Sequence, residues 1–278
     1  MNHAMTPETS AVEPGGMDFQ RHIGEITTQT DLLRATIAGA DMTVPVPSCP
    51  GWNVGQLVRH LGGAHRWVAE TVRTPASTAP PQEEVRELDG YTHEDPAVLG
   101  PWLAEGAALL TDALREAEPD VRLWVPVPSL PPYPTFHARR MAHETVVHRA
   151  DATLALGAGF TVGQRVAVDT LEEWMELGSL PEVLEFHPQQ RELLGPGRTV
   201  ALHATDTPPG LGAEWVVDLT GEAITWRRGH EAAAVAVRGP LTELLLLVYR
   251  RRPMAEADIE VLGDADLLDF WLDRVSFG

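Results

Sequence analysis

Two side chains that can bind a metal stand four residues apart in the segment RRMAHETVVHRADA, which begins at Arg139. On a helix, Glu144 and His148 would share one face about 6 Å apart, because positions i and i+4 lie one above the other. A carboxylate and an imidazole so placed can hold a divalent ion from two sides. His143 is rotated by about 100° from Glu144 and is not expected to join them. His137 shares the face of Glu144 but lies about 10 Å along the axis, so we expect it in a supporting position or at the mouth of the site.

A third ligand has to come from another helix, and the segment VRHLGGAHRW offers His60 and His65. His60 lies on the apolar stripe of its expected helix, and His65 is rotated from it by about 140°, so only one of them is expected to face the bundle axis. We therefore predict His60, Glu144 and His148 as metal ligands, with at least one coordination position open. This donor set suits Zn²⁺, although iron, nickel or another divalent ion accepts the same ligand types. An isolated Glu–His pair is more often a surface pair, so the rest of the chain has to support the site.

These side chains need a helical frame, which the apolar periodicity predicts over residues 17–38, 53–72, 97–117 and 137–156. Four such helices indicate an up-and-down bundle. After a further helix over 163–177 the pattern changes to strands, expected at Thr199–Ala204, Trp215–Leu219, Ala223–Trp226, Ala232–Val237 and Ile259–Leu262, with helices over 241–250 and 264–275. The predicted fold class is therefore α+β, with a disordered tail over 1–16, a bundle over 17–158 and a smaller α+β domain over 159–278.

The composition excludes several classes of protein. A net charge of −19 disfavours binding to nucleic acid. All 21 basic residues are arginine, which excludes a P-loop lysine, a pyridoxal Schiff base and a lysine nucleophile. No apolar run approaches the ~20 residues that span a bilayer, and the first residues lack the pattern of an export signal. We therefore expect no membrane partner and a cytoplasmic location; the single cysteine, Cys49, permits no intramolecular disulfide.

The stretch PSCPGWNVGQLVRHLGGAHRW, with RRMAHETVVHRADA about 80 residues further on, resembles the mycothiol-dependent maleylpyruvate isomerase family. The segments LLLLVYRRRP and GDADLLDFWLDRVSF resemble the C-terminal domain of that family, so the resemblance covers most of the chain. It implies a DinB-like four-helix bundle followed by a domain similar to sterol carrier proteins. It also implies zinc ligands at the matching positions His60, Glu144 and His148.

The resemblance further implies an active-site arginine, which the family carries in a tryptophan–glycine–arginine context. Counting back from Pro253 makes Arg251 the equivalent and places Arg250 at the position of the glycine. The planar fork of an arginine can hold a carboxylate of the substrate or of the thiol. Alternatively, these arginines only solvate the end of helix 241–250 and favour its dipole. Asp151 is expected to accept the second ring N–H of His148 or to pair with an arginine.

Together these features predict a metal-dependent enzyme that uses a small-molecule thiol, mycothiol, to attack an electrophilic small molecule. The outcome would be cis–trans isomerisation or S-transfer. The implied cofactor is a divalent metal, in the first place zinc, at which the thiol would ionise near neutral pH. Two alternatives remain: a metal-dependent hydrolase or lyase that needs no thiol, and a non-catalytic metal-containing binding protein. The long loops over 74–96 and 119–136 are expected to shape the pocket for the electrophile.

Overall fold

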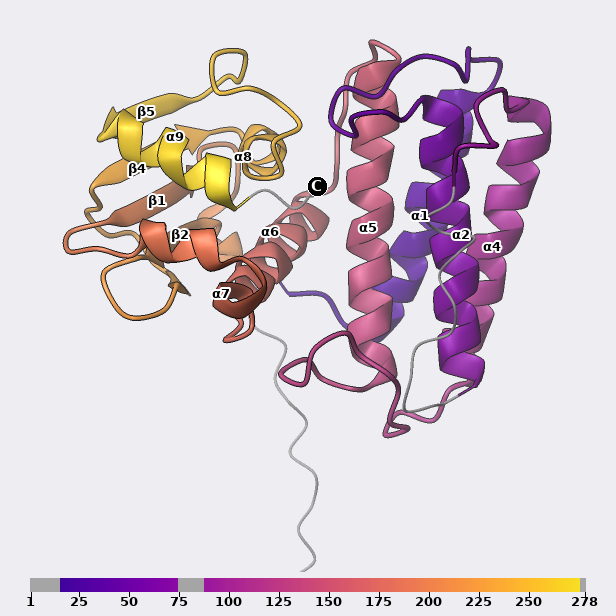
Figure 1. Cartoon of the computed structure of the whole chain (residues 1–278), viewed down its shortest axis with the longest axis horizontal. Helices are drawn as coiled ribbons and strands as arrows, with labels where there is room; N and C mark the ends of the chain where they lie inside the picture. The colour runs from indigo at the N-terminus through magenta and orange to yellow at the C-terminus, as the bar shows by residue number, and fades with distance from the viewer. Residues whose placement is uncertain (1–15, 75–87, 276–278) are drawn as a thin grey trace, which may run out of the picture.

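A computed structural model describes residues 16–74 and 88–275 of the chain. A helical bundle forms the N-terminal part, and a sheet with its covering helices forms the C-terminal part (Figure 1). The predicted α+β fold class is thereby confirmed. The predicted boundary between residues 158 and 159 falls in the segment between the last bundle helix and the next helix. The predicted tail, apart from Gly16, and residues 75–87 of the first long loop lie outside the described residues.

The bundle consists of the helices α1 (Phe19–Ile37), α2 (Val54–Arg73), α4 (Pro96–Glu116) and α5 (Pro134–Ala155). Helices α1 and α2 each pack against both α4 and α5, so every helix buries one stripe against two neighbours. Local signals fix where the helices begin. The Asn53 side chain accepts from the backbone N–H of Gln56, whose own side chain accepts from the Asn53 N–H. This reciprocal capping box satisfies two of the N–H groups that a helix start leaves unpaired.

Helix α5, which carries two of the predicted ligands, begins three residues earlier than predicted. The proline-rich sequence before His137 was expected to be a loop, but Pro134 occupies the first turn of the helix. A proline fits there because its fixed φ is helical and its missing N–H would have no partner within the helix. Gly157, with φ of 71°, lies just beyond the end of α5.

The C-terminal domain begins with α6 (Gln164–Gly178), followed by the short helices α7 (Val183–Phe186) and η1 (Pro188–Leu193), which the sequence did not predict. Five strands then form one sheet in the order β3-β2-β1-β4-β5. Their bounds are β1 (Thr199–Ala204), β2 (Glu214–Asp218), β3 (Thr225–Arg228), β4 (Val235–Gly239) and β5 (Glu260–Gly263). Strands β1 and β4 are parallel, and the other pairs are antiparallel. Helices α8 (Leu241–Val248) and α9 (Ala265–Arg274) contact the sheet, and α6 packs on α8.

The end of α8 is closed by a tight turn that positions Arg251. The N–H of Arg250 donates to the carbonyl of Leu247 at 2.9 Å, and the N–H of Arg251 donates to that of Leu246 at 2.7 Å. These two bonds define a Schellman motif, in which the residue after the cap takes a left-handed conformation. That residue is Arg250, with φ of 59°, and no other non-glycine residue in the described range has a positive φ. A glycine would adopt this conformation without steric cost.

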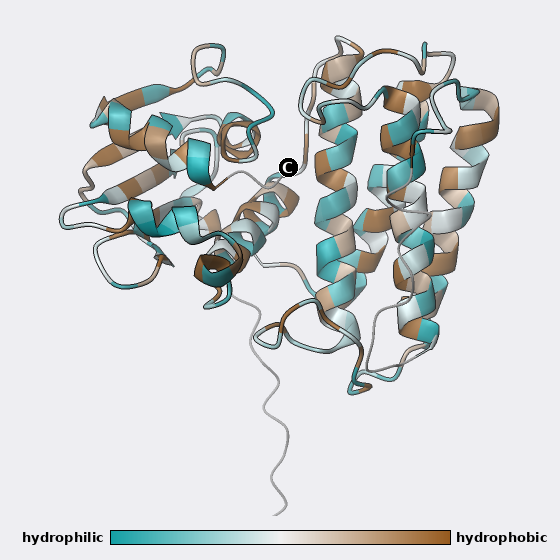
Figure 2. Cartoon of the chain, in the orientation of Figure 1, coloured by the Kyte–Doolittle hydropathy of each residue, from teal (hydrophilic) through white to brown (hydrophobic). Residues whose placement is uncertain are grey.

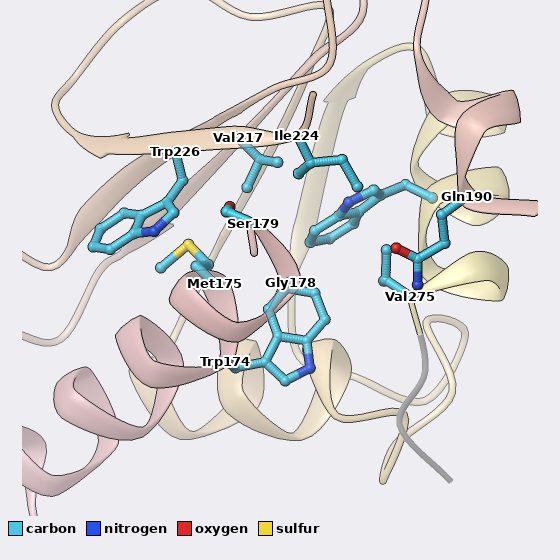
Figure 3. A pocket seen from close by; sticks show the side chains of 10 residues that line it. Trp174, Met175, Gly178, Ser179, Gln190, Val217, Ile224, Trp226 and Val275 are labelled. Atoms are coloured by element: carbon cyan, nitrogen blue, oxygen red, sulfur yellow. The ribbon is translucent and has the colours of Figure 1, made fainter. Parts of the chain in front are cut away.

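Apolar residues are distributed differently in the bundle helices and in the C-terminal domain. Among the described residues, no helix is long and apolar enough to cross a membrane, and Figure 2 shows polar and apolar residues mixed along the bundle helices. In the C-terminal domain, Trp174, Trp226 and Trp271 line an apolar cavity between α6 and the sheet (Figure 3). Its volume of about 10 Å³ is the space of a single water. It is therefore a packing gap and offers no room for a substrate.

Candidate metal centre

The structure brings the three predicted ligands together. Glu144 Oε1 lies 3.1 Å from His148 Nε2 and 3.8 Å from His60 Nε2, and the two imidazole rings stand edge to face with centroids 5.2 Å apart. All three ligand atoms lie within 4.8 Å of one another. Donors about 2.0–2.2 Å from a tetrahedral ion are roughly 3.4 Å apart. The spacing and chemistry of this set, called the bundle cluster below, therefore fit a divalent metal such as zinc.

A carboxylate behind His148 fixes the orientation of its ring. Asp151 Oδ2 lies 2.9 Å from His148 Nδ1, which leaves Nε2 directed at Glu144. This is the arrangement that supports ligating histidines in metal sites. Burial by itself would lower the pKa of His148, but its hydrogen bonds to Asp151, Cys49 and Glu144 hold that pKa well above its ordinary value. A metal ion at Nε2 would therefore displace a proton from His148.

Arg251 reaches the same carboxylate from the C-terminal domain. Its Nε and Nη2 donate to the two oxygens of Asp151 at 2.8 and 3.2 Å, and its Nη1 donates to the carbonyl of Tyr249 at 2.6 Å. These bonds use three of the five N–H groups of a guanidinium. The alternative expectation for Arg251, simple solvation of a helix end, is wrong, because its side chain is only 8% exposed. Arg250, in contrast, points to the surface and pairs with Asp273.

Glu144 is held as a carboxylate by its own helix. Arg140, one turn earlier, donates to Glu144 Oε2, and its other terminal nitrogen lies 2.5 Å from Glu173 on α6. Burial would raise the pKa of Glu144, but Arg140 and the hydrogen bonds to His148 and His60 keep it well below its ordinary value. Arg140 was not among the predicted site residues, although its i,i+4 spacing from Glu144 was an available signal.

The bundle cluster borders a cavity of about 400 Å³, large enough for a small ligand. Its wall combines three parts of the chain: the segment before α2, the middle of α5 and the turn after α8. The lining residues are Ser48, Cys49, Pro50, Trp52, Arg140, Glu144, Val147, His148, Tyr249 and Arg251. The expectation that the long loops 74–96 and 119–136 shape this pocket is wrong for their described residues, none of which lines it. The segment before α2 does so instead, because capping at Asn53 holds it against the start of that helix.

Three other histidines that the sequence offered lie outside the bundle cluster. His65, not His60, faces the bundle interior: it is fully buried and its Nε2 lies 3.0 Å from Thr145 Oγ1. His60 is only half-buried and does not lie on the inner face of α2. His137 was expected near the site but does not line the cavity, because it lies about two turns before Glu144 on α5. It donates instead to the carbonyl of Trp124 at 2.9 Å. His143 is absent from the bundle cluster, as predicted.

The fold and the site define a class of protein in which a helical bundle carries a His–Glu–His cluster and an α+β domain adds an arginine beside it. Residues 23–153 match the family model for the mycothiol maleylpyruvate isomerase N-terminal domain, and residues 165–270 match that for the MDMPI C-terminal domain. The chain therefore belongs to the mycothiol maleylpyruvate isomerase family, as its resemblance to that family implied.

Solved structures show the same fold. A crystal structure of the mycothiol-dependent maleylpyruvate isomerase aligns with a TM-score of 0.59 at 16% identity, covering 90% of this chain and 95% of that one. A crystal structure of a histidine-to-alanine mutant of that isomerase aligns with a TM-score of 0.58 at 14% identity, covering 88% and 93%. No curated protein sequence matches the chain significantly.

Proposed function

We propose that this protein is a metal-dependent enzyme that joins mycothiol to an electrophilic small molecule, either transiently, as an isomerase, or permanently, as an S-transferase. The observation that carries the proposal is the meeting of His60, Glu144 and His148 beside a cavity that Glu144, His148 and Arg251 line. Membership in the family and the isomerases named among its structural relatives support a thiol as the cosubstrate.

The residues divide the chemistry between them. A divalent metal bound to His60, Glu144 and His148 would supply a positive charge that lowers the pKa of a thiol in the cavity, and so favours the thiolate nucleophile. Asp151 accepts from Nδ1 of His148 and so keeps Nε2 directed at Glu144, where it would meet the metal. Arg140 holds Glu144 ionised, so that the carboxylate stays a ligand at neutral pH.

We assign to Arg251 the binding of an acidic group of the thiol or of the electrophile. Two of its N–H groups remain after its bonds to Asp151 and Tyr249, and its side chain lines the cavity. A carboxylate of the thiol or of the electrophile would accept from them. The attacking sulfur forms a bond to an unsaturated carbon. Rotation of the adduct followed by loss of the thiolate gives isomerisation, whereas protonation of the adduct gives S-transfer.

The decisive experiment measures metal and activity together. Purified protein is loaded with Zn²⁺ and assayed with mycothiol against a panel of electrophiles that includes maleylpyruvate, with products read by mass spectrometry. We expect turnover that requires both zinc and mycothiol. Glu144→Gln and His148→Ala should each lose most of the turnover and the zinc bound at this cluster, while His137→Gln, a buried histidine outside the cluster, should keep both.

Three results would contradict the proposal. Zinc-dependent turnover that proceeds equally without mycothiol would indicate a hydrolase or lyase. If Glu144→Gln and His148→Ala bound as much zinc as the wild type, the metal site would lie elsewhere. If the protein bound zinc but showed no thiol-dependent reaction across the panel, it would be a non-catalytic binding protein.

A further inference from the structure

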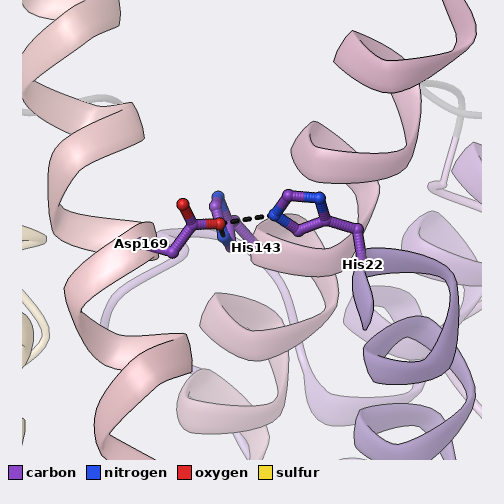
Figure 4. Close-up of side chains that lie close together, drawn as sticks. All are labelled: His22, His143 and Asp169. Atoms are coloured by element: carbon purple, nitrogen blue, oxygen red, sulfur yellow. Dashed lines mark hydrogen bonds and ion pairs between the residues drawn. The ribbon is translucent and has the colours of Figure 1, made fainter. Parts of the chain in front are cut away.

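A second set of metal-binding side chains lies where the bundle meets the C-terminal domain. His22 of α1, His143 of α5 and Asp169 of α6 point toward one another from three helices (Figure 4). Asp169 Oδ2 lies 2.5 Å from His22 Nε2 and 3.0 Å from His143 Nε2. All three residues are buried, and their ligand atoms lie within 4.8 Å of one another. We call this set the junction cluster.

The two ring nitrogens of His143 face two different carboxylates. His143 is completely buried, and its Nδ1 lies 2.8 Å from Glu173 Oε2, to which it donates. Its Nε2 lies 3.0 Å from Asp169 Oδ2, but the two atoms are not aligned as a hydrogen bond. A buried polar atom without a hydrogen bond calls for an explanation. A cation held between Nε2 and Oδ2 would provide one.

The junction cluster repeats the design of the bundle cluster. Each contains two imidazoles and one carboxylate, and in each a second carboxylate accepts from the far ring nitrogen of one histidine: Asp151 for His148, and Glu173 for His143. Such an outer carboxylate fixes the ring tautomer in metal sites. Arg139 pairs with Oδ1 of Asp169, at 3.3 Å, and donates to the Asp169 backbone carbonyl, so Oδ2 remains directed at the two histidines.

A small opening of the junction cluster would admit an ion, and a neighbouring cavity would supply a further ligand. Donors of a tetrahedral zinc ion lie roughly 3.4 Å apart, so the side chains would have to separate by less than about 1 Å. His22 and Asp169 line a cavity of about 890 Å³ between the start of α1, the start of α5 and α6. Water from that cavity can complete the coordination.

From these observations we infer that the chain has a second divalent-metal site, formed by His22, His143 and Asp169, which ties α6 of the C-terminal domain to helices α1 and α5 of the bundle. The ligand set suits Zn²⁺. The inference concerns a structural ion and does not depend on the proposed thiol chemistry. Arg140 connects the two clusters, since it bonds both Glu144 and Glu173.

The test counts ions in the full chain. Protein stripped by a chelator is titrated with Co²⁺, followed by its visible absorption, and separately loaded with Zn²⁺ for elemental analysis. We expect two equivalents in the wild type, one in His148→Ala, one in His22→Gln and none in the double variant. His137→Gln, which alters a buried histidine outside both clusters, should keep two.

His148→Ala isolates the junction cluster, so the inference is testable even if His22→Gln fails to fold. Zinc should then raise the melting temperature of His148→Ala, because an ion that binds only the folded state stabilises it. The absence of a bound ion in folded His148→Ala would overturn the inference. So would two equivalents in His22→Gln, which would place the second ion elsewhere, for example at His203, Glu214 and His230.

Discussion

At the scale of single residues, the spacing of Glu144 and His148 along one helix predicted that they lie together. The inward-facing histidine of α2, in contrast, was predicted wrongly. Glu144 and His148 belong together because an α-helix fixes positions i and i+4 regardless of the rest of the fold. The choice of His60 over His65 rested on the assumption that ligands face the bundle axis. The structure places His65 on the inner face and His60 beside Glu144. The difference could not be predicted, because it depends on how α2 packs against α4 and α5, which are distant from it in sequence.

His65 should make the protein sensitive to mild acid. Burial, with a smaller effect of Arg66, lowers the pKa of His65 to about 3, against 6.5 without these effects. Between these values the unfolded state binds a proton that the folded state does not. Stability therefore falls as the pH drops below about 6.5, by at most about 1.4 kcal/mol per pH unit.

Replacing this histidine isolates its contribution. His65→Gln can still donate to Thr145 and cannot be protonated, so its melting temperature should fall less than that of the wild type between pH 6.5 and pH 4. His93→Gln, at an exposed histidine, serves as the control and should follow the wild type. Identical pH profiles for His65→Gln and the wild type would show that His65 is not buried in its neutral form.

At the scale of helices and strands, local signals set the boundaries that were predicted best. The capping box at Asn53 placed the start of α2, observed at Val54, within one residue of the prediction. The strands β3 and β4 begin two and three residues later than predicted, at Thr225 and Val235. Strands have no caps, and the bounds of β3 and β4 depend on pairing with β2, β1 and β5, which a local pattern does not show.

The contact between α2 and α4 depends on a missing side chain. A Cβ placed on Gly62 would lie 2.2 Å from Cζ3 of Trp102, so the helices approach closely only because Gly62 has none. Gly62→Ala should lower the free energy of unfolding by about 1–3 kcal/mol through overpacking. Gly24→Ala in α1 is the matched control: no atom lies within 4 Å of its added Cβ, so it should gain about 0.5–1 kcal/mol. Chemical denaturation of both variants measures the difference, and equal stabilities would refute the close approach.

The turn after α8 predicts a substitution that stabilises the protein. Arg250 has a left-handed conformation that costs a residue with a Cβ roughly 1–2 kcal/mol. Arg250→Gly should raise the free energy of unfolding by about 0.5–1 kcal/mol after the greater chain entropy of glycine is subtracted. Arg250→Ala also removes the pairing with Asp273 but keeps the Cβ, so it should bring no gain. A stabilised alanine variant would assign the effect to the lost arginine instead of to the backbone.

At the scale of the whole molecule, the feature that no local pattern predicted is the junction between its two parts. Asp151 and Arg251 are 100 residues apart in sequence and bonded in the structure. The expectation for Asp151 named His148 and an unspecified arginine, since sequence spacing reaches only within one helix. The resemblance to the family, and not periodicity, singled out Arg251. The junction cluster was missed for the same reason, because its members come from α1, α5 and α6.

Asp151→Asn tests how far this junction supports the bundle cluster. The amide cannot pair with Arg251 as a carboxylate does and is a weaker acceptor for Nδ1 of His148. We expect zinc affinity at the bundle cluster to fall about 10–100-fold, as for other outer partners of ligating histidines. Isothermal titration measures it, best in a His22→Gln background. Asp273→Asn, which removes the surface partner of Arg250, should leave the affinity unchanged; equal affinity in both variants would contradict a supporting role for Asp151.

The carboxylate of Asp151 thus contacts both domains, so a change in their relative position alters the surroundings of His148. Any hinge motion that withdraws Arg251 from Asp151 changes the electronic environment of the His148 imidazole, although that ring belongs to the other half. By thermodynamic reciprocity, a proton or metal bound to the His148 ring also shifts the equilibrium between positions of the two domains. The NMR chemical shifts of the His148 ring would therefore report on motion between the domains without an added label.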